Sequence, residues 1–268
     1  MNGFLKISDS LAEFEEITGG LLNGQSPVSA MGVSDAVRAH LIFSVCKKRK
    51  KCPLIVTATE AQARIIFEDI SYFFDGKALL FPNRDLLFYD IEASANDIKK
   101  NRLDVLDKLV QQPHEYAVVT TASTLLSATA PKSVYEDKVL TLKVGDEIEI
   151  EDLCNIMIDF GYRREEMVEG PGQFSIRGGI FDYFPFWSDM PFRIEFFDCL
   201  VDSVRRFYPE TQRTVAENDD TEICARITPA DEILADESVR RQTVKVLKKR
   251  LKAAEDKNDG AENTQKLI

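Results

Sequence analysis

The stretch QFSIRGGIFDYFPF, residues 173–186, is followed closely by PFRIEFFDCLVDSVRRF, residues 191–207. Apolar and polar side chains alternate in both segments, and successive side chains of a β-strand point to opposite faces of a sheet. The pattern therefore predicts a small antiparallel sheet with one apolar face. Gly178 and Gly179 interrupt the first segment and predict a bend or bulge that resets the alternation.

The polar face of this predicted sheet carries a candidate contact patch. Arg193, Glu195 and Phe197 point to the same side, so an aromatic ring lies on the polar face beside an arginine. Arg177 has the corresponding orientation in the preceding segment. If the two strands are neighbours, Arg177, Arg193 and Phe197 share one exposed face that is suited to a protein partner. The alternative is that both arginines pair with Glu195 or Asp182 and only complete the surface.

The N-terminal half has a different pattern, in which short apolar runs alternate with amphipathic segments. This alternation predicts a parallel, doubly wound α/β sheet. The expected strands are 28–33, 53–58, 77–81 and 116–120, and the expected helices are 35–46, 60–74 and 96–109.

These patterns divide the chain into three segments. Residues 1–137 are the first part of an α/β domain, and residues 138–225 are a small α+β domain with a helix at 150–160 packed on its sheet. Residues 226–268 return to the α/β domain, which we expect to be incomplete, and end in a basic amphipathic helix over 238–254.

The bulk composition excludes several classes of protein. The net charge of −11 disfavours nucleic acid as the main partner, although residues 47–51 and 240–252 form local basic runs. No apolar run approaches the roughly 20 residues of a membrane helix, and the N-terminus lacks a signal-peptide pattern. We therefore expect a cytoplasmic protein without a membrane partner. Five scattered cysteines without a CxxC pair predict neither a zinc site nor a disulfide framework.

Residues 28–42 have the strand, glycine turn and helix of a phosphate-binding loop, but they lack its chemistry. Counted from Gly32, the pattern GxxxxGK[ST] requires glycine, lysine and a hydroxyl residue where this chain has Val37, Arg38 and Ala39. Val37 is β-branched and disfavours the backbone conformation that the second glycine allows. The guanidinium of Arg38 is not equivalent to the compact ammonium of the lysine, and Ala39 has no hydroxyl to bind magnesium. The sequence predicts a degenerate loop and no cofactor.

Two segments of the chain resemble the UvrB-homology region, which the excision-repair helicase UvrB shares with the transcription-repair coupling factors (Mfd). They are GQFSIRGGIFDYFP at 172–185 and PFRIEFFDCLVDSVRRFYPETQRT at 191–214. FPNRDLLFYD at 81–90 and the helix beginning at Asn101-Arg102-Leu103 resemble further family stretches, so the resemblance covers about residues 25–235. The degenerate loop, and the short segment 91–100 where UvrB carries a long aromatic hairpin, favour the N-terminal module of the coupling factors.

This resemblance implies a fold and a partner. It implies a degenerate RecA/helicase-like domain with an inserted small domain that docks onto the damage sensor UvrA. By motif match, the UvrA contacts fall on Arg177, Arg193 and Phe197. In full-length family members, further domains supply ATP- and magnesium-dependent translocation, contacts with RNA polymerase and DNA, and a C-terminal domain that covers the UvrA-binding surface.

Three hypotheses follow from the sequence. The favoured one is a non-catalytic docking module that recruits UvrA to stalled transcription, for which Arg193→Ala weakens binding and leaves the fold intact. A UvrB-type nucleotide-dependent helicase core requires a loop that Val37, Arg38 and Ala39 do not provide. A direct DNA-binding module would use the basic runs at 47–51 and 240–252.

Overall fold

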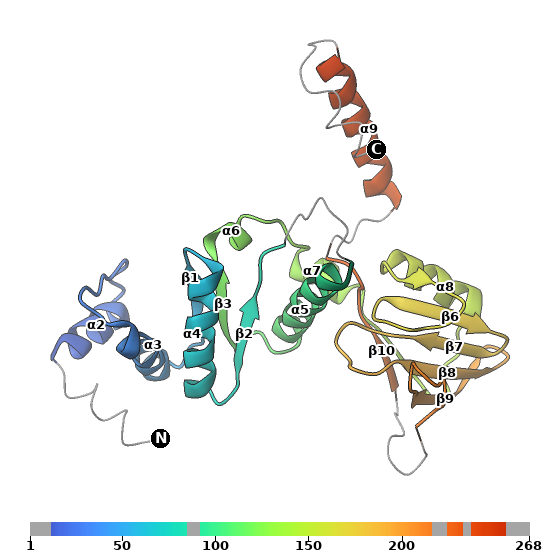
Figure 1. The fold of residues 1–268 in the computed structure, drawn as a ribbon, viewed down its shortest axis with the longest axis horizontal. Coiled ribbons are helices and arrows are strands. Elements are labelled where there is room, and N and C mark those ends of the chain that lie inside the picture. The colour runs from blue at the N-terminus through green and yellow to red at the C-terminus, as the bar shows by residue number, and fades with distance from the viewer. Residues whose placement is uncertain (1–11, 85–91, 216–223, 233–236, 256–268) are drawn as a thin grey trace. The chain divides into compact units, whose positions relative to one another are not determined.

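The structure of the protein is a computed structural model, which describes residues 12–84, 92–215, 224–232 and 237–255 (Figure 1). The chain forms two compact units, Met1–Ala128 and Thr129–Ile268. Part of the FPNRDLLFYD motif lies outside the described residues. Each unit has its own sheet, so each is considered by itself.

The first unit contains a parallel sheet with the strand order β1-β3-β2. Its strands are β1 (Leu54–Thr57), β2 (Ala78–Phe81) and β3 (Ala117–Thr121), and its helices are α2 (Ala12–Leu22), α3 (Asp35–Arg49), α4 (Glu60–Phe73), α5 (Glu92–Gln111) and α6 (Ala122–Leu125). The predicted alternation of strands and helices is confirmed. A mixed α/β architecture with a parallel sheet is therefore established for this unit.

Helix α4 covers one face of this sheet (Figure 1). It begins where the Thr59 side chain accepts a hydrogen bond from the Gln62 amide, a normal N-cap. Its apolar stripe, with Ile66 and Ile70, packs on Val119 and neighbouring residues of the sheet. The burial of this stripe holds the helix on the sheet.

The strand expected at residues 28–33 is not formed. A β-strand is stabilised by hydrogen bonds to a neighbour, and no strand within the described residues pairs with this segment. Gly32, at the turn before α3, has a positive φ of 75° that glycine adopts without strain. The apolar run 28–33 was thus insufficient evidence for a strand.

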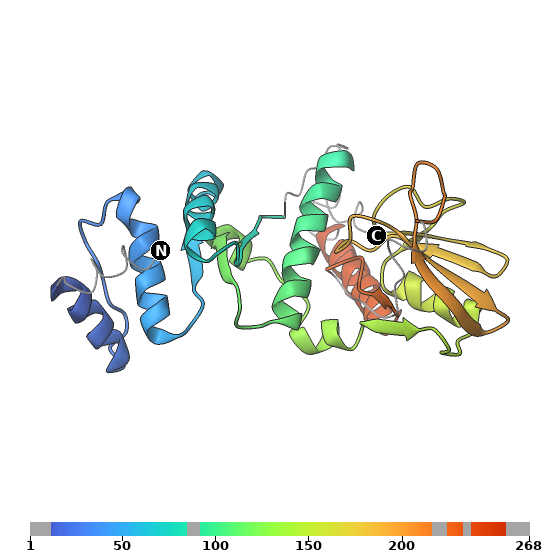
Figure 2. The ribbon, with the colours of Figure 1, turned by 90° about the horizontal axis from the view of Figure 1, so that it is seen from below.

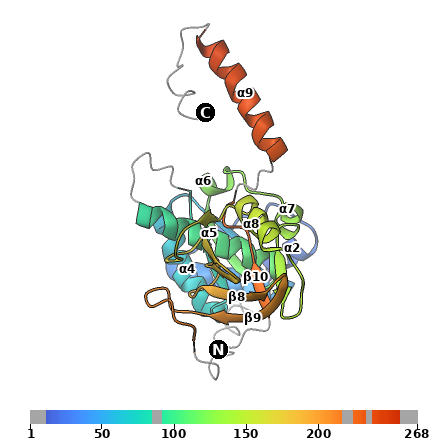
Figure 3. The same cartoon turned by 90° about the vertical axis from the view of Figure 1, so that its right-hand side faces the viewer.

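The second unit is built around a five-stranded sheet in the order β5-β6-β7-β8-β9, of which Figure 1 labels the last four strands. Figure 3 shows β8 and β9 of this sheet from the side. Its strands are β5 (Arg163–Arg164), β6 (Gln173–Arg177), β7 (Ile180–Tyr183), β8 (Phe192–Phe197) and β9 (Leu200–Arg206). All neighbouring pairs are antiparallel except β5 and β6. The antiparallel sheet predicted from the alternation is confirmed, with one short parallel addition at its edge.

The remaining elements of this unit are α7 (Lys132–Glu136), β4 (Leu140–Lys143), α8 (Ile150–Asp159), β10 (Cys224–Ile227) and α9 (Glu237–Glu255). Strands β4 and β10 form a separate antiparallel pair. Helix α8, yellow-green in Figure 2, lies beside the five-stranded sheet and buries Leu153 and Met157. The helix predicted at 150–160 therefore has its expected place against the sheet.

Gly178 and Gly179 form a two-residue hairpin turn between β6 and β7, where we expected a bend or bulge. Arg177 pairs with Ile180 across the turn, and Gly178 has a φ of 61°. A Cβ atom on Gly179 would lie 2.7 Å from the Phe196 carbonyl oxygen. Glycine is required here because the backbone of β8 approaches so closely.

Candidate docking surface

The strand register separates the two faces of the five-stranded sheet as the alternation predicts. Phe174 pairs with Tyr183, which pairs with Phe192, and all three are buried on the apolar face. Ser175, Asp182 and Arg193 form the next row and point to the opposite face. We call this opposite side of the sheet the outer face.

The outer face contains all three residues that the sequence singled out. Arg177 aligns with Ile180, and Ile180 aligns with Glu195 on β8. Phe197 follows two residues after Glu195. The register shift between Glu195 and Phe196 leaves Asp202 of β9 as the extra residue, so the alternation along β8 is kept and Phe197 points to the same side as Glu195. The register therefore brings Arg177, Arg193 and Phe197 onto one face.

The centre of this face is an arginine cluster on one buried carboxylate. Asp182 is fully buried, and it accepts hydrogen bonds from the Arg193 Nε at 2.7 Å and Nη2 at 2.9 Å. It also accepts a 2.6 Å hydrogen bond from the Arg177 Nη2. One negative charge thus orients two guanidinium groups, and the geometry on Arg193 is bidentate.

Arg193 is much less accessible than the sequence suggests, and the expectation that it lies on a wet face is wrong. Only 11% of its side chain is exposed. Its Nη1 donates to the Gln212 carbonyl oxygen at 3.2 Å, and its guanidinium lies 4.7 Å from the centre of the Phe207 ring. The hydrogen bond to Asp182 raises the pKa of Arg193 above its usual value, so the group stays charged.

The turn after β9 covers this part of the face. Gln212 has a left-handed φ of 58°, and its Nε2 donates to the carbonyl oxygens of Val168 and Pro209. Sequence analysis did not predict that this turn covers Arg193. The sequence around a polar turn residue does not indicate which distant strand that residue will pack against.

Arg177 and Phe197 remain accessible. The Arg177 side chain is 41% exposed, and Phe197 is 77% exposed at the end of β8. Phe197 pairs with Leu200 across the β8–β9 hairpin, and Leu200 is also exposed. The outer face therefore offers one cation and an apolar hairpin tip, with Arg193 held beneath the covering turn.

The degenerate loop residues lie at the start of α3 in the first unit. The Arg38 guanidinium forms an ion pair with Asp35, one turn earlier on the same helix. Val37 is half exposed, whereas Ala39 is buried in the core cluster beneath α4.

Both a segment of the chain and most of its length are similar to known proteins. Residues 140–230, which include the whole five-stranded sheet, match the UvrB interaction domain family. The chain is 32% identical over 232 residues to the transcription-repair-coupling factor of Bacillus subtilis, which covers 86% of this chain and 19% of that protein. It is 33% identical over 218 residues to the Staphylococcus epidermidis factor, covering 81% of this chain and 18% of the relative.

Over most of its length, the chain is similar to the transcription-repair-coupling factors, and residues 140–230 are similar to the UvrB interaction domain. These similarities support a UvrB-homology module like that of the coupling factors. The chain spans about a fifth of the length of the curated relatives it matches. Within the described residues, no helix is both long and apolar enough to cross a membrane.

Proposed function

We propose that this chain is a non-catalytic docking module of transcription-coupled nucleotide excision repair, and that it recruits the damage sensor UvrA to stalled transcription. The match to the UvrB interaction domain supports a protein-binding role. The observation that carries the proposal is the exposed Phe197 on the same sheet face as two arginines held by Asp182.

The outer face suits binding to UvrA because its arginines are preorganised and its aromatic side chain is exposed. Asp182 fixes both guanidinium groups, so less side-chain entropy is lost on binding. Arg177 retains donors for an acidic group of UvrA. Phe197 supplies an aromatic anchor of the kind that dominates binding energy at the centre of interfaces.

We propose residues 138–225 as the UvrA-binding domain, inserted into a degenerate RecA-like domain formed by 1–137 and 226–268. The proposal that the chain is not an ATPase is supported by the α3 start. Ala39 is buried in the core, and Arg38 is engaged by Asp35, so neither fits the role of a phosphate or magnesium ligand. For full-length members of the family, we propose contacts with RNA polymerase and DNA, ATP-driven movement and a covering C-terminal domain.

The test is titration of UvrA with the chain by calorimetry. We expect Phe197→Ala to weaken binding by about 2 kcal/mol, and Arg177→Ala by about 1 kcal/mol. The matched control is Tyr72→Ala, which removes an exposed aromatic ring from α4 in the first unit. Equal affinities for wild type, Phe197→Ala and Arg177→Ala would refute the assignment of the surface.

The non-catalytic role is tested separately by thermal unfolding with Mg-ATP. A ligand present at about 100 times its Kd stabilises a protein by roughly 2.7 kcal/mol. We expect no shift of the transition. A clear shift, or measurable ATP hydrolysis, contradicts the proposal for the region around Gly32.

A further inference from the structure

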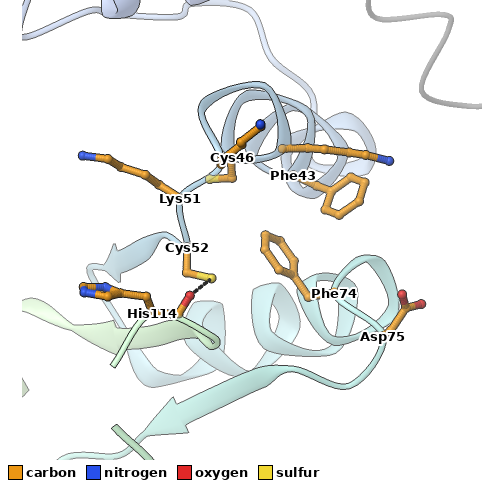
Figure 4. A pocket seen from close by; sticks show the side chains of 9 residues that line it. Phe43, Cys46, Lys51, Cys52, Phe74, Asp75 and His114 are labelled. Atoms are coloured by element: carbon orange, nitrogen blue, oxygen red, sulfur yellow. Dashed lines mark hydrogen bonds between the residues drawn. The ribbon is translucent and has the colours of Figure 1, made fainter. Parts of the chain in front are cut away.

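A second candidate binding site lies in the first unit, away from the degenerate loop (Figure 4). It is an open hollow of about 450 Å³ between the end of α3, the end of α4 and the turn before β3. Lys47, Lys50 and Lys51 line it from α3 and the residues that follow. His114 belongs to the opposite wall, so the hollow is built by segments far apart in the sequence.

The hollow carries a local excess of positive charge in an acidic chain. Its three lysines are exposed, and no ion pair to them is found among the described residues. Asp75 contributes one negative charge to the lining. Cys46 and Cys52 contribute none near neutral pH, because burial raises the pKa of Cys46 to about 11 and also raises that of Cys52.

The helix end does not account for this many cations. The Lys51 amide donates to the Cys46 carbonyl at 3.1 Å, and the Lys50 amide donates to the Lys47 carbonyl at 3.2 Å. These bonds already satisfy two terminal carbonyl groups. The remaining dipole is equivalent to roughly half a negative charge, whereas residues 47–51 carry five positive charges.

The inner wall of the hollow is aromatic. Phe43 and Phe74 line it and meet edge to face, with ring centroids 5.1 Å apart. The Cys52 thiol donates to the His114 carbonyl oxygen at 3.1 Å and links the two walls (Figure 4). The lysines therefore lie around a hollow that is lined by aromatic side chains and whose walls are joined by a hydrogen bond.

We propose that Lys47, Lys50 and Lys51, together with Phe43 and Phe74, form a binding site for a single strand of nucleic acid. Ammonium groups bind phosphates as point charges, so the three lysines of the lining match the charge of a phosphate backbone. Aromatic side chains beside a basic groove accept bases without sequence preference. This site is independent of the UvrA-docking surface.

The acidic remainder of the chain does not prevent such binding. Exposed charges farther away than about 10 Å are largely screened at 0.1 M salt. A phosphate in the hollow therefore experiences mainly the lysines around it. Contacts with three phosphates of a single strand predict a slope of about −2 for log K against log salt.

The experiment is fluorescence anisotropy of a labelled oligonucleotide of about twelve nucleotides, at about 50 mM salt and above. The variant K47E/K50E/K51E is compared with K245E/K248E/K249E, which changes the net charge equally on the basic helix α9. We expect wild-type binding at micromolar to 100 micromolar concentrations, a loss of at least about tenfold in the first variant and under about twofold in the second.

Three results overturn the proposal. One is a wild-type chain that does not bind the oligonucleotide at low salt, and another is an equal loss of affinity in both triple variants. The third is displacement of the strand by a poly-glutamate peptide as readily as by unlabelled oligonucleotide. Thermal unfolding of both variants shows whether they remain folded, which is expected because all six lysines are exposed.

Discussion

Replacing Arg193 by alanine should destabilise the second unit, in contrast to the expectation from the sequence that the fold stays intact. The substitution removes two hydrogen bonds from the fully buried Asp182 and leaves only the one from Arg177. Breaking a buried ion pair from one side costs about 3–5 kcal/mol. Because Arg177 stays in place, we expect a loss of about 2–4 kcal/mol in the free energy of unfolding.

Urea unfolding followed by tryptophan fluorescence measures this loss directly. Trp187 is the chain's single tryptophan; its ring lies 5.4 Å from that of Phe192, and its Nε1 donates to the Arg226 carbonyl. It therefore reports on the second unit. With a slope near 2 kcal/mol per molar urea, the midpoint should fall by about 1–2 M.

Two exposed neighbours serve as controls. Phe197→Ala should leave the free energy of unfolding within about 0.5 kcal/mol of wild type, because that ring is 77% exposed. Arg177→Ala should cost about 1 kcal/mol, since its side chain is partly solvated. The reasoning about Asp182 is refuted if Arg193→Ala unfolds at the wild-type midpoint.

Three further predictions concern the fold and the thiols. Gly179→Ala should lower stability by about 1–3 kcal/mol in urea unfolding, because its Cβ would meet the Phe196 carbonyl, and a wild-type midpoint would contradict that contact. Thr59→Ala at the N-cap of α4 should lower the free energy of unfolding by about 1 kcal/mol, and Ser34→Ala at the N-cap of α3 should lower it less. The Thr59 side chain accepts a capping hydrogen bond and the Ser34 side chain does not, so equal losses would contradict this difference. At about pH 8, iodoacetamide should alkylate Cys46 about 100-fold more slowly in the folded than in the unfolded chain, because the raised pKa of Cys46 reduces its thiolate fraction. Mass spectrometry measures both rates, and their difference should shrink as the pH rises from about 9 to 11. Equal rates at pH 8 would refute this prediction.

Much of the fold could be predicted because it depends on local periodicity. The strands around Phe174, Phe181 and Ile194 follow the two-residue period, and α4 and α8 follow the helical period. The run 28–33 shows where this reasoning fails. Its apolar residues are compatible with a strand, but a strand also needs a neighbour, which local sequence does not specify.

The shared face of the three candidate residues was predictable, but their accessibility was not. Arg177, Arg193 and Phe197 could be assigned to one face because alternation is a property of the extended backbone. The sequence left open whether the arginines pair with Glu195 or Asp182. The structure selects Asp182 as their hydrogen-bonded ion-pair partner.

The sequence by itself determined which side chains point to the same side of each strand, and that the second glycine, the lysine and the hydroxyl residue of the phosphate-binding pattern are missing after Gly32. Only the tertiary structure decided which of those side chains reach solvent. Gln212 covers Arg193 through a bond to the Val168 carbonyl, 44 residues away, and His114 meets Cys52 across 62 residues. Burial depends on such distant segments coming together, whereas orientation along a strand depends only on the geometry of neighbouring residues.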